Sequence, residues 1–217
     1  MFKQLSRILL PLASGLLLAA AAQADTAASS QGPDVELKQT TEQIRGLIGK
    51  NYNQYKASPD TFYKAVDEVV VPRFDVPGIA RLVLGANYRA ASDAQRQRFA
   101  TAFKDMLVHS YANAMLDNYN SVNITWLPPR MAPNATDAAV NTSLARSNGQ
   151  NFAIGFRVHV VDGDWKIYDI TVENVSLVLN FRTQLNSEIK RTSLDDVISR
   201  MEAGQFKPEP DKQQKTN

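Results

Sequence analysis

The spacing of apolar residues changes twice along this chain, and this change restricts the fold more than any other feature of the sequence. Between residues 35 and 119 apolar residues recur every three or four positions, which predicts amphipathic helices. Between residues 122 and 172 they alternate with polar residues, which predicts strands, and after residue 174 the helical spacing returns. Helices followed by strands and then by helices indicate an α+β fold.

Several helix ends carry recognisable signals. Ser58 before Pro59 predicts a helix that begins with a capping serine and a proline in its first turn. Asp75 can cap a short helix that Gly85 ends by taking a positive φ. Ser92-Asp93-Ala94-Gln95 predicts a capping box at the start of the longest helix.

The strand region has turn signals between its segments. Asn148-Gly149 and Asp162-Gly163 are both favoured in two-residue hairpins. The predicted strands span residues 122–127, 138–146, 152–161 and 165–172. We therefore expect a four-stranded antiparallel meander with one apolar and one more polar face, and helices packed on one face. Residues 35–203 are predicted to form one domain.

The first 24 residues have the layout of a secretory signal peptide. Lys3 and Arg7 precede an apolar run over residues 8–22, and Ala22 and Ala24 are the small residues that a signal peptidase requires. The run is shorter than the roughly 20 residues needed to span a bilayer. We expect cleavage after Ala24, a disordered leader over residues 25–34 and a disordered tail over residues 204–217.

Composition excludes several classes of function. The chain has no cysteine, so it has no disulfide, no thiolate metal site and no lipid anchor at a cleavage-site cysteine. Loss of Lys3 and Arg7 with the signal peptide would leave as many basic as acidic residues. A neutral chain argues against nucleic acid as a partner, because binding to phosphates requires a basic surplus.

No catalytic or metal-binding motif is evident. His109 and His159 are the only histidines, too few for a three-histidine metal site. Asp169 interrupts an apolar stretch and is a candidate general base, although a salt bridge is the commoner role for such a residue. The apolar faces can fill a solid core or line a cavity, and periodicity does not distinguish the two.

Two long stretches carry a resemblance to a known family. The first is PRFDVPGIARLVLG at residues 72–85, followed by NYR at 87–89, and the second is DWKIYDITVENVSLV at 164–178, followed by NFR at 180–182. With the signal peptide, they make the chain resemble the MlaC, or toluene-tolerance, family over residues 35–202. The chain departs from the family pattern at Tyr88, at Asn174 and at Arg191-Thr192-Ser193.

This resemblance implies a soluble, monomeric phospholipid carrier in the periplasm. Such proteins exchange phospholipid between an outer-membrane lipoprotein–porin complex and an inner-membrane ABC transporter with an MCE component, and so maintain outer-membrane lipid asymmetry. The implied fold is NTF2-like, with an apolar lipid cavity between sheet and helices. No catalytic residue, metal or cofactor is implied, and the phospholipid is the carried ligand.

Within this resemblance we predict which side chains contact lipid. Tyr88 and Arg182 are expected near the mouth, as a hydrogen-bond donor and a phosphate partner. The predicted wall residues are Phe74, Ile79, Val83, Phe103, Leu107, Tyr111, Phe156, Val158, Val172, Val175, Val178 and Leu179.

Two other functions remain open at this stage. A periplasmic chaperone or adaptor would use the same apolar surface for peptide segments. An isomerase on an NTF2-like fold would use a carboxylate base and a tyrosine donor, for which Asp169 with Tyr111 or Tyr168 are the candidates.

Overall fold

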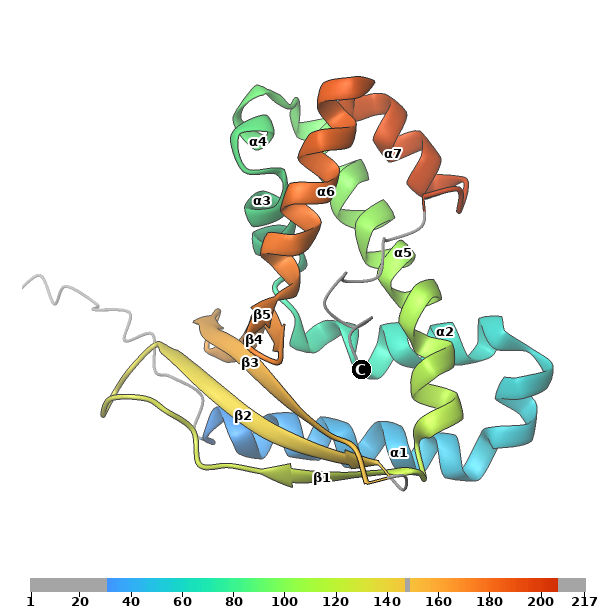
Figure 1. Cartoon of the computed structure of the whole chain (residues 1–217), viewed down its shortest axis with the longest axis vertical. Coiled ribbons are helices and arrows are strands. Elements are labelled where there is room, and N and C mark those ends of the chain that lie inside the picture. Colours follow the sequence, from blue (N-terminus) through green and yellow to red (C-terminus); the bar gives the residue numbers. More distant parts are fainter. Residues whose placement is uncertain (1–30, 147–148, 207–217) are drawn as a thin grey trace, which may run out of the picture.

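The computed structural model describes residues 31–146 and 149–206, which follow the predicted order of helices, sheet and helices (Figure 1). The predicted signal peptide and residues 207–217 lie outside this range. The helices are α1 (Pro33–Ala57), α2 (Pro59–Val69), the 3-10 turn η1 (Val71–Arg73), α3 (Val76–Leu84), α4 (Ala86–Ala90), α5 (Asp93–Asn118), α6 (Leu177–Arg191) and α7 (Leu194–Glu202). The strands are β1 (Val122–Trp126), β2 (Asp137–Arg146), β3 (Asn151–Val161), β4 (Asp164–Val172) and β5 (Val175–Ser176).

The sheet is an antiparallel meander in the order β1-β2-β3-β4-β5. It has one strand more than predicted, because the chain turns back beside β4 before α6 begins. Glu173 and Asn174 form this turn with positive φ angles of 49° and 65°. Asparagine enters the left-handed region more readily than most residues, so Asn174 suits this position without being glycine. Asp162 and Gly163 also take positive φ angles, which confirms the predicted hairpin between β3 and β4.

The two faces of the sheet differ in polarity. The strand register places Val140, Phe156 and Ile170 beside one another on one face. Helix α1 covers this apolar face, and its Leu37 packs with Val140 and Val158. Arg157 lies on the opposite, more polar face. This separation matches the alternation of apolar and polar residues in the sequence.

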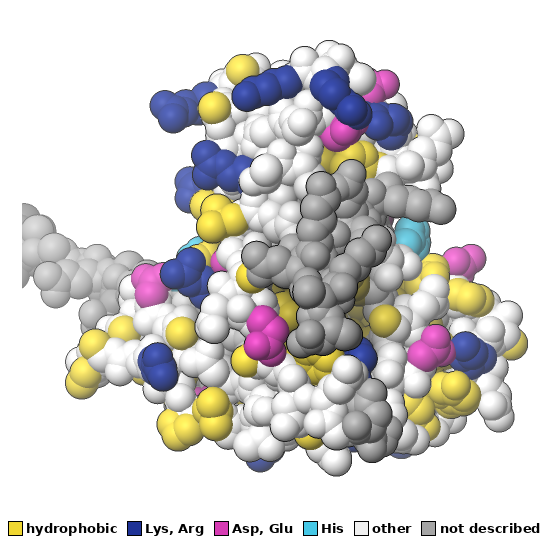
Figure 2. Space-filling model, viewed as in Figure 1, with side chains coloured by type: hydrophobic (Ala, Val, Ile, Leu, Met, Phe, Trp, Pro, Cys, Tyr) yellow, Lys and Arg dark blue, Asp and Glu magenta, His cyan; other side chains and the backbone are white. Residues whose placement is uncertain are grey.

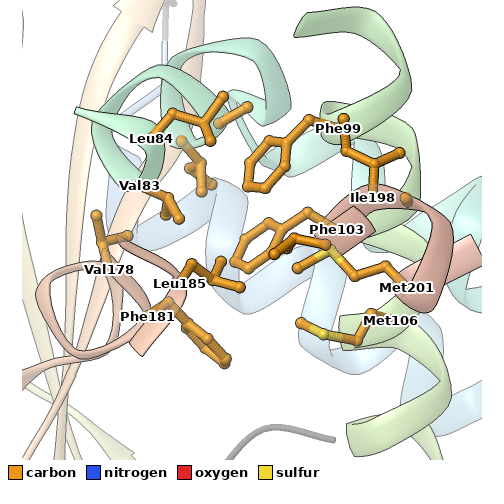
Figure 3. Close-up of a cluster of buried hydrophobic side chains, with 14 residues drawn as sticks. Val83, Leu84, Phe99, Phe103, Met106, Val178, Phe181, Leu185, Ile198 and Met201 are labelled. Carbon is orange, nitrogen blue, oxygen red and sulfur yellow. The ribbon is translucent and has the colours of Figure 1, made fainter. Parts of the chain in front are cut away.

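Helices α3, α5, α6 and α7 pack around their own solid core, which forms the upper half of the molecule in Figure 1. Figure 3 shows its side chains pointing toward one another from all four helices. Phe103 stacks on Phe99 at a centroid distance of 5.6 Å and meets Phe181 edge-on at 5.2 Å. Burying each such side chain contributes about 1.5–3 kcal/mol.

A second cluster joins α1, α2 and α5 in the lower half. Ile48 and Phe62 are fully buried there, and the rings of Tyr55 and Phe62 lie 5.0 Å apart. Helix α5 contributes to both clusters, so it connects the two halves of the molecule.

Two of the predicted helix caps are present. The Asp75 carboxylate accepts a hydrogen bond from the Gly78 amide at 2.9 Å. Ser92 and Gln95 form the reciprocal capping box at the start of α5. These bonds satisfy amides that have no partner within the helix.

The predicted Ser58 cap is wrong. The Ser58 side chain makes no capping hydrogen bond at the start of α2. Its carbonyl oxygen instead accepts hydrogen bonds from the Thr61 amide at 3.0 Å and hydroxyl at 2.6 Å. Pro59 is the first residue of α2, as predicted. Within the described ranges, no helix is long and apolar enough to cross a bilayer.

Candidate functional site

An apolar cavity of about 550 Å³ lies between the sheet, α1 and the end of α5. Its volume is within the range of roughly 300–1,000 Å³ that is usual for small-molecule sites. Strands β1 to β4 form one wall, and α1, α5 and the segment around η1 form the others. The apolar wall residues are Leu37, Ile44, Ile48, Val70, Phe74, Ala114, Met115, Val122, Ile124, Trp126, Leu144, Phe152, Ile154, Phe156, Ile167, Ile170 and Val172.

Several large apolar side chains on this wall are only half-buried. Leu144, Phe152 and Ile154 belong to this group, whereas Phe99 in the upper core is fully buried. Water in contact with apolar surface is unfavourable, so the wall gains free energy when an apolar ligand covers it. The apolar face of the sheet is therefore covered by a solid core near Val158, whereas near Ile154 it borders the cavity.

Three of the predicted wall residues line this cavity, namely Phe74, Phe156 and Val172. The backbone of Phe74 pairs with Ile167 on the open edge of β4, which positions its ring at the wall. Trp126 stacks on Phe156 at a centroid distance of 6.2 Å and extends the wall toward β1.

A second group of predicted wall residues lies in the upper helical core. Ile79, Val83, Phe103 and Val178 are buried there, and Leu107 and Tyr88 pack against them. Their apolar faces have the helical spacing that the sequence indicates. They meet other helices of the upper half, however, and not the hollow side of the sheet.

The remaining predicted residues lie outside the cavity wall. Val158 is fully buried against α1, and Val175 is half-buried in β5. Tyr111 is 49% exposed and Leu179 is 57% exposed. Arg182 belongs to α6, and its side chain lies against Gly85 at the end of α3. A Cβ added to Gly85 would be 2.8 Å from the Arg182 Nε. Neither Tyr88 nor Arg182 is at the mouth of this cavity.

The sequence did not predict that side chains of α1 line the cavity. Leu37, Ile44 and Ile48 follow the helical spacing in the sequence and line the cavity together. The signal was present, but it could not show that this helix lies over the sheet.

Arginines are the charged residues that reach the wall: Arg45, Arg73 and Arg146. Arg73 is paired, since its Nη1 lies 3.0 Å from Glu36 Oε2 and its Nε donates to the Thr40 hydroxyl at 3.0 Å. These contacts connect η1 to α1.

Asp169 lies away from the cavity wall. It is buried at the start of α6, where Oδ1 accepts the Val178 amide at 3.2 Å and Oδ2 lies 3.9 Å from Arg157 Nη1. The sequence favoured a salt bridge over a catalytic role for Asp169, and Asp169 is paired with Arg157. Within residues 31–146 and 149–206, no cluster of three or more His, Cys, Asp or Glu residues could hold a metal ion.

Comparison with known proteins places this fold in a family. The model of the MlaC protein family matches residues 38–203. The chain belongs to the MlaC family. Among similar MlaC-type proteins is the toluene tolerance protein ttg2D of Pseudomonas putida, which is 30% identical over 182 residues and is matched over 83% of this chain and 84% of its own length.

A second relative is the intermembrane phospholipid transport system binding protein MlaC of Haemophilus influenzae. It is 22% identical over 186 residues, which cover 84% of this chain and 86% of the relative. The fold also matches the phospholipid-binding protein from Ralstonia solanacearum, solved in complex with a phospholipid. That match has a TM-score of 0.72 and 23% identity, and it covers 81% of this chain and 97% of the other.

Proposed function

We propose that this MlaC-family chain is a periplasmic phospholipid carrier. It would exchange lipid between an outer-membrane lipoprotein–porin complex and an inner-membrane ABC transporter with an MCE component. This exchange would maintain the lipid asymmetry of the outer membrane. The observation that carries the proposal is the half-buried apolar wall between sheet and α1, which offers a place for acyl chains.

The energetics of lipid transfer explain why such a hollow is needed. Exposing one methylene to water costs about 0.8 kcal/mol, so a long acyl chain costs on the order of 10 kcal/mol. A lipid cannot cross the aqueous periplasm at a useful rate unless its chains are shielded. The apolar wall residues supply this shielding, and the function requires no covalent step.

Measurement of bound lipid tests the proposal. We expect native mass spectrometry of protein isolated from the periplasm to show phospholipid bound in stoichiometric amounts. Ala114→Trp should reduce the bound lipid, because Ala114 lines the cavity and an indole would occupy part of it. Ala94→Trp on the exposed start of α5 is the matched control and should retain lipid.

A transfer assay tests the carrying step itself. The protein should move labelled phospholipid between donor and acceptor vesicles, and Ala114→Trp should slow this transfer. Protein that holds no phosphorus and instead prevents aggregation of unfolded proteins would be the alternative chaperone. Bound lipid that never exchanges between vesicles would also contradict the carrier.

A further inference from the structure

The charges on the cavity wall are of one sign. Arg45, Arg73 and Arg146 line it, and among the described lining residues there is no aspartate or glutamate. Arg73 is neutralised by Glu36. The net charge that faces the cavity therefore comes from the other two arginines.

Arg45 faces the cavity from α1. It is half-buried on α1, next to Ile44 and one turn after Thr41, both of which line the cavity. Over the described ranges of the chain, its guanidinium makes no ion pair with a carboxylate. A partly desolvated guanidinium without a carboxylate attracts an anion more strongly than one in water.

Arg146 is the second arginine, and it is exposed at the end of β2. Its guanidinium carbon lies 4.8 Å from the ring centre of Phe152, which is itself a wall residue. Stacking on an aromatic ring restricts the guanidinium and leaves its edge donors available. In the described part of the chain, Arg146 likewise has no carboxylate within ion-pair distance.

We propose that Arg45 and Arg146 bind the headgroup phosphate and make the cavity prefer phospholipids with a net negative charge over zwitterionic ones. This inference rests on the proposed function and adds the class of lipid. Both classes present a phosphate, but a zwitterionic headgroup also carries an ammonium group. No carboxylate among the described wall residues is available to that ammonium, and the two guanidinium groups repel it.

The test compares two lipids with identical acyl chains. Delipidated protein is incubated with vesicles of equal parts phosphatidylglycerol and phosphatidylcholine, and the bound lipids are counted by native mass spectrometry. We expect about a fivefold preference for phosphatidylglycerol, the factor that corresponds to the upper end of what a solvent-exposed ion pair contributes. The preference should shrink at high salt, because partly exposed charges are screened.

Variants assign the preference to the two side chains. Arg45→Gln and Arg146→Gln should each reduce the preference about twofold, so that the double variant loses most of it, whereas Arg45→Lys, which keeps the charge, should retain most of it. Arg89→Gln is the matched control. Arg89 is exposed on α4 and does not line the cavity. Lys and Arg side chains are numerous on the surface of the upper helices (Figure 2).

The outcomes separate the two proposals. Equal binding of both lipids by the unaltered protein, or glutamine variants that keep the full preference, would overturn the headgroup assignment while leaving the carrier intact. Binding of neither lipid would contradict the carrier itself. Glycerol 3-phosphate tests for a small-anion site: it should not bind measurably without acyl chains, and saturable binding would overturn the assignment to a lipid headgroup.

Discussion

His159 Nε2 lies 3.0 Å from Asp75 Oδ2, so an imidazole on the polar face of β3 contacts the capping residue of α3. The other oxygen of the same carboxylate accepts the Gly78 amide. Asp75 thereby connects the sheet to the first turn of the upper helices. Its position is fixed further by the backbone, since the Asp75 amide donates to the Ile167 carbonyl at 2.9 Å.

Replacement of Asp75 should separate its capping role from its contact with His159. Asp75→Ala removes both and should lower the free energy of unfolding by about 1–2 kcal/mol. Asp75→Asn keeps a side-chain oxygen that can cap α3 and should cost about half as much. Urea denaturation measures both values, and equal losses for the two variants would show that the cap contributes nothing.

Gly78→Ala should destabilise the protein although alanine is the better helix former. A Cβ at Gly78 would lie 1.9 Å from Asp75 Oδ2, so the capping side chain would have to turn away. Gly46→Ala, with nothing within 4 Å of the added Cβ, should instead stabilise by about 0.5–1 kcal/mol. The contrast in sign is read from urea denaturation of the two variants.

The Gly78 penalty should also depend on Asp75. In an Asp75→Ala background the clash is absent, and Gly78→Ala should lose most of its cost. A penalty that persists there would trace to another contact and contradict the explanation.

Phe103 and Ile154 should behave differently because one lies in a solid core and the other on the cavity wall. Phe103→Ala should cost about 3–5 kcal/mol and leave the lipid content per folded molecule unchanged. Ile154→Ala should cost less than about 2 kcal/mol, because the residue is half-buried, and should reduce retained lipid. Urea denaturation and native mass spectrometry give the two quantities. A Phe103→Ala protein that stays stable but loses lipid would place the upper cluster on the binding surface.

Glu188 should make stability depend on acidic pH. Hydrogen bonds from Arg191 and then from Arg200, on α7, hold the pKa of its carboxyl below the ordinary value. The folded-state pKa is thus lower than the unfolded one, so the stabilisation is complete above the unfolded value of about 4.3. It is lost as the pH falls through the folded pKa.

Glu188→Gln should therefore flatten the dependence of Tm on pH below about pH 5. Glu68→Gln is the control, because Glu68 is exposed on α2 and makes no ion pair with another described residue. An unchanged slope for Glu188→Gln would mean that the contact between α6 and α7 does not depend on this charge.

The sequence predicted the elements well because their signals are local. The capping box at Ser92 and the Asp162-Gly163 turn each involve residues close together in the chain, and both are present. The short strand β5 was missed because a two-residue strand has too few positions to show a period. The relevant signal was Asn174, a residue that tolerates positive φ.

The wall of the cavity was only partly predictable for the opposite reason. Val83 and Ile154 belong to apolar faces that look alike in the sequence, yet one meets other helices and the other faces a hollow. The difference depends on how α1 and α5 lie against the sheet, which is set by contacts between distant parts of the chain. Arg45 and Arg146 could not be predicted as wall residues from the sequence. A polar residue at a cavity and one on the outer surface follow the same periodic pattern.

The upper helical cluster is separate from the hollow. Among the described residues, none of its buried members, such as Phe99 and Leu185, lines the cavity wall. A protein whose ligand completes its only core unfolds when the ligand departs. Here the four-helix cluster packs on protein side chains alone. In the carrier that we propose, this cluster is expected to keep its packing when the hollow is vacant, so that one molecule is loaded and unloaded repeatedly without being refolded or replaced.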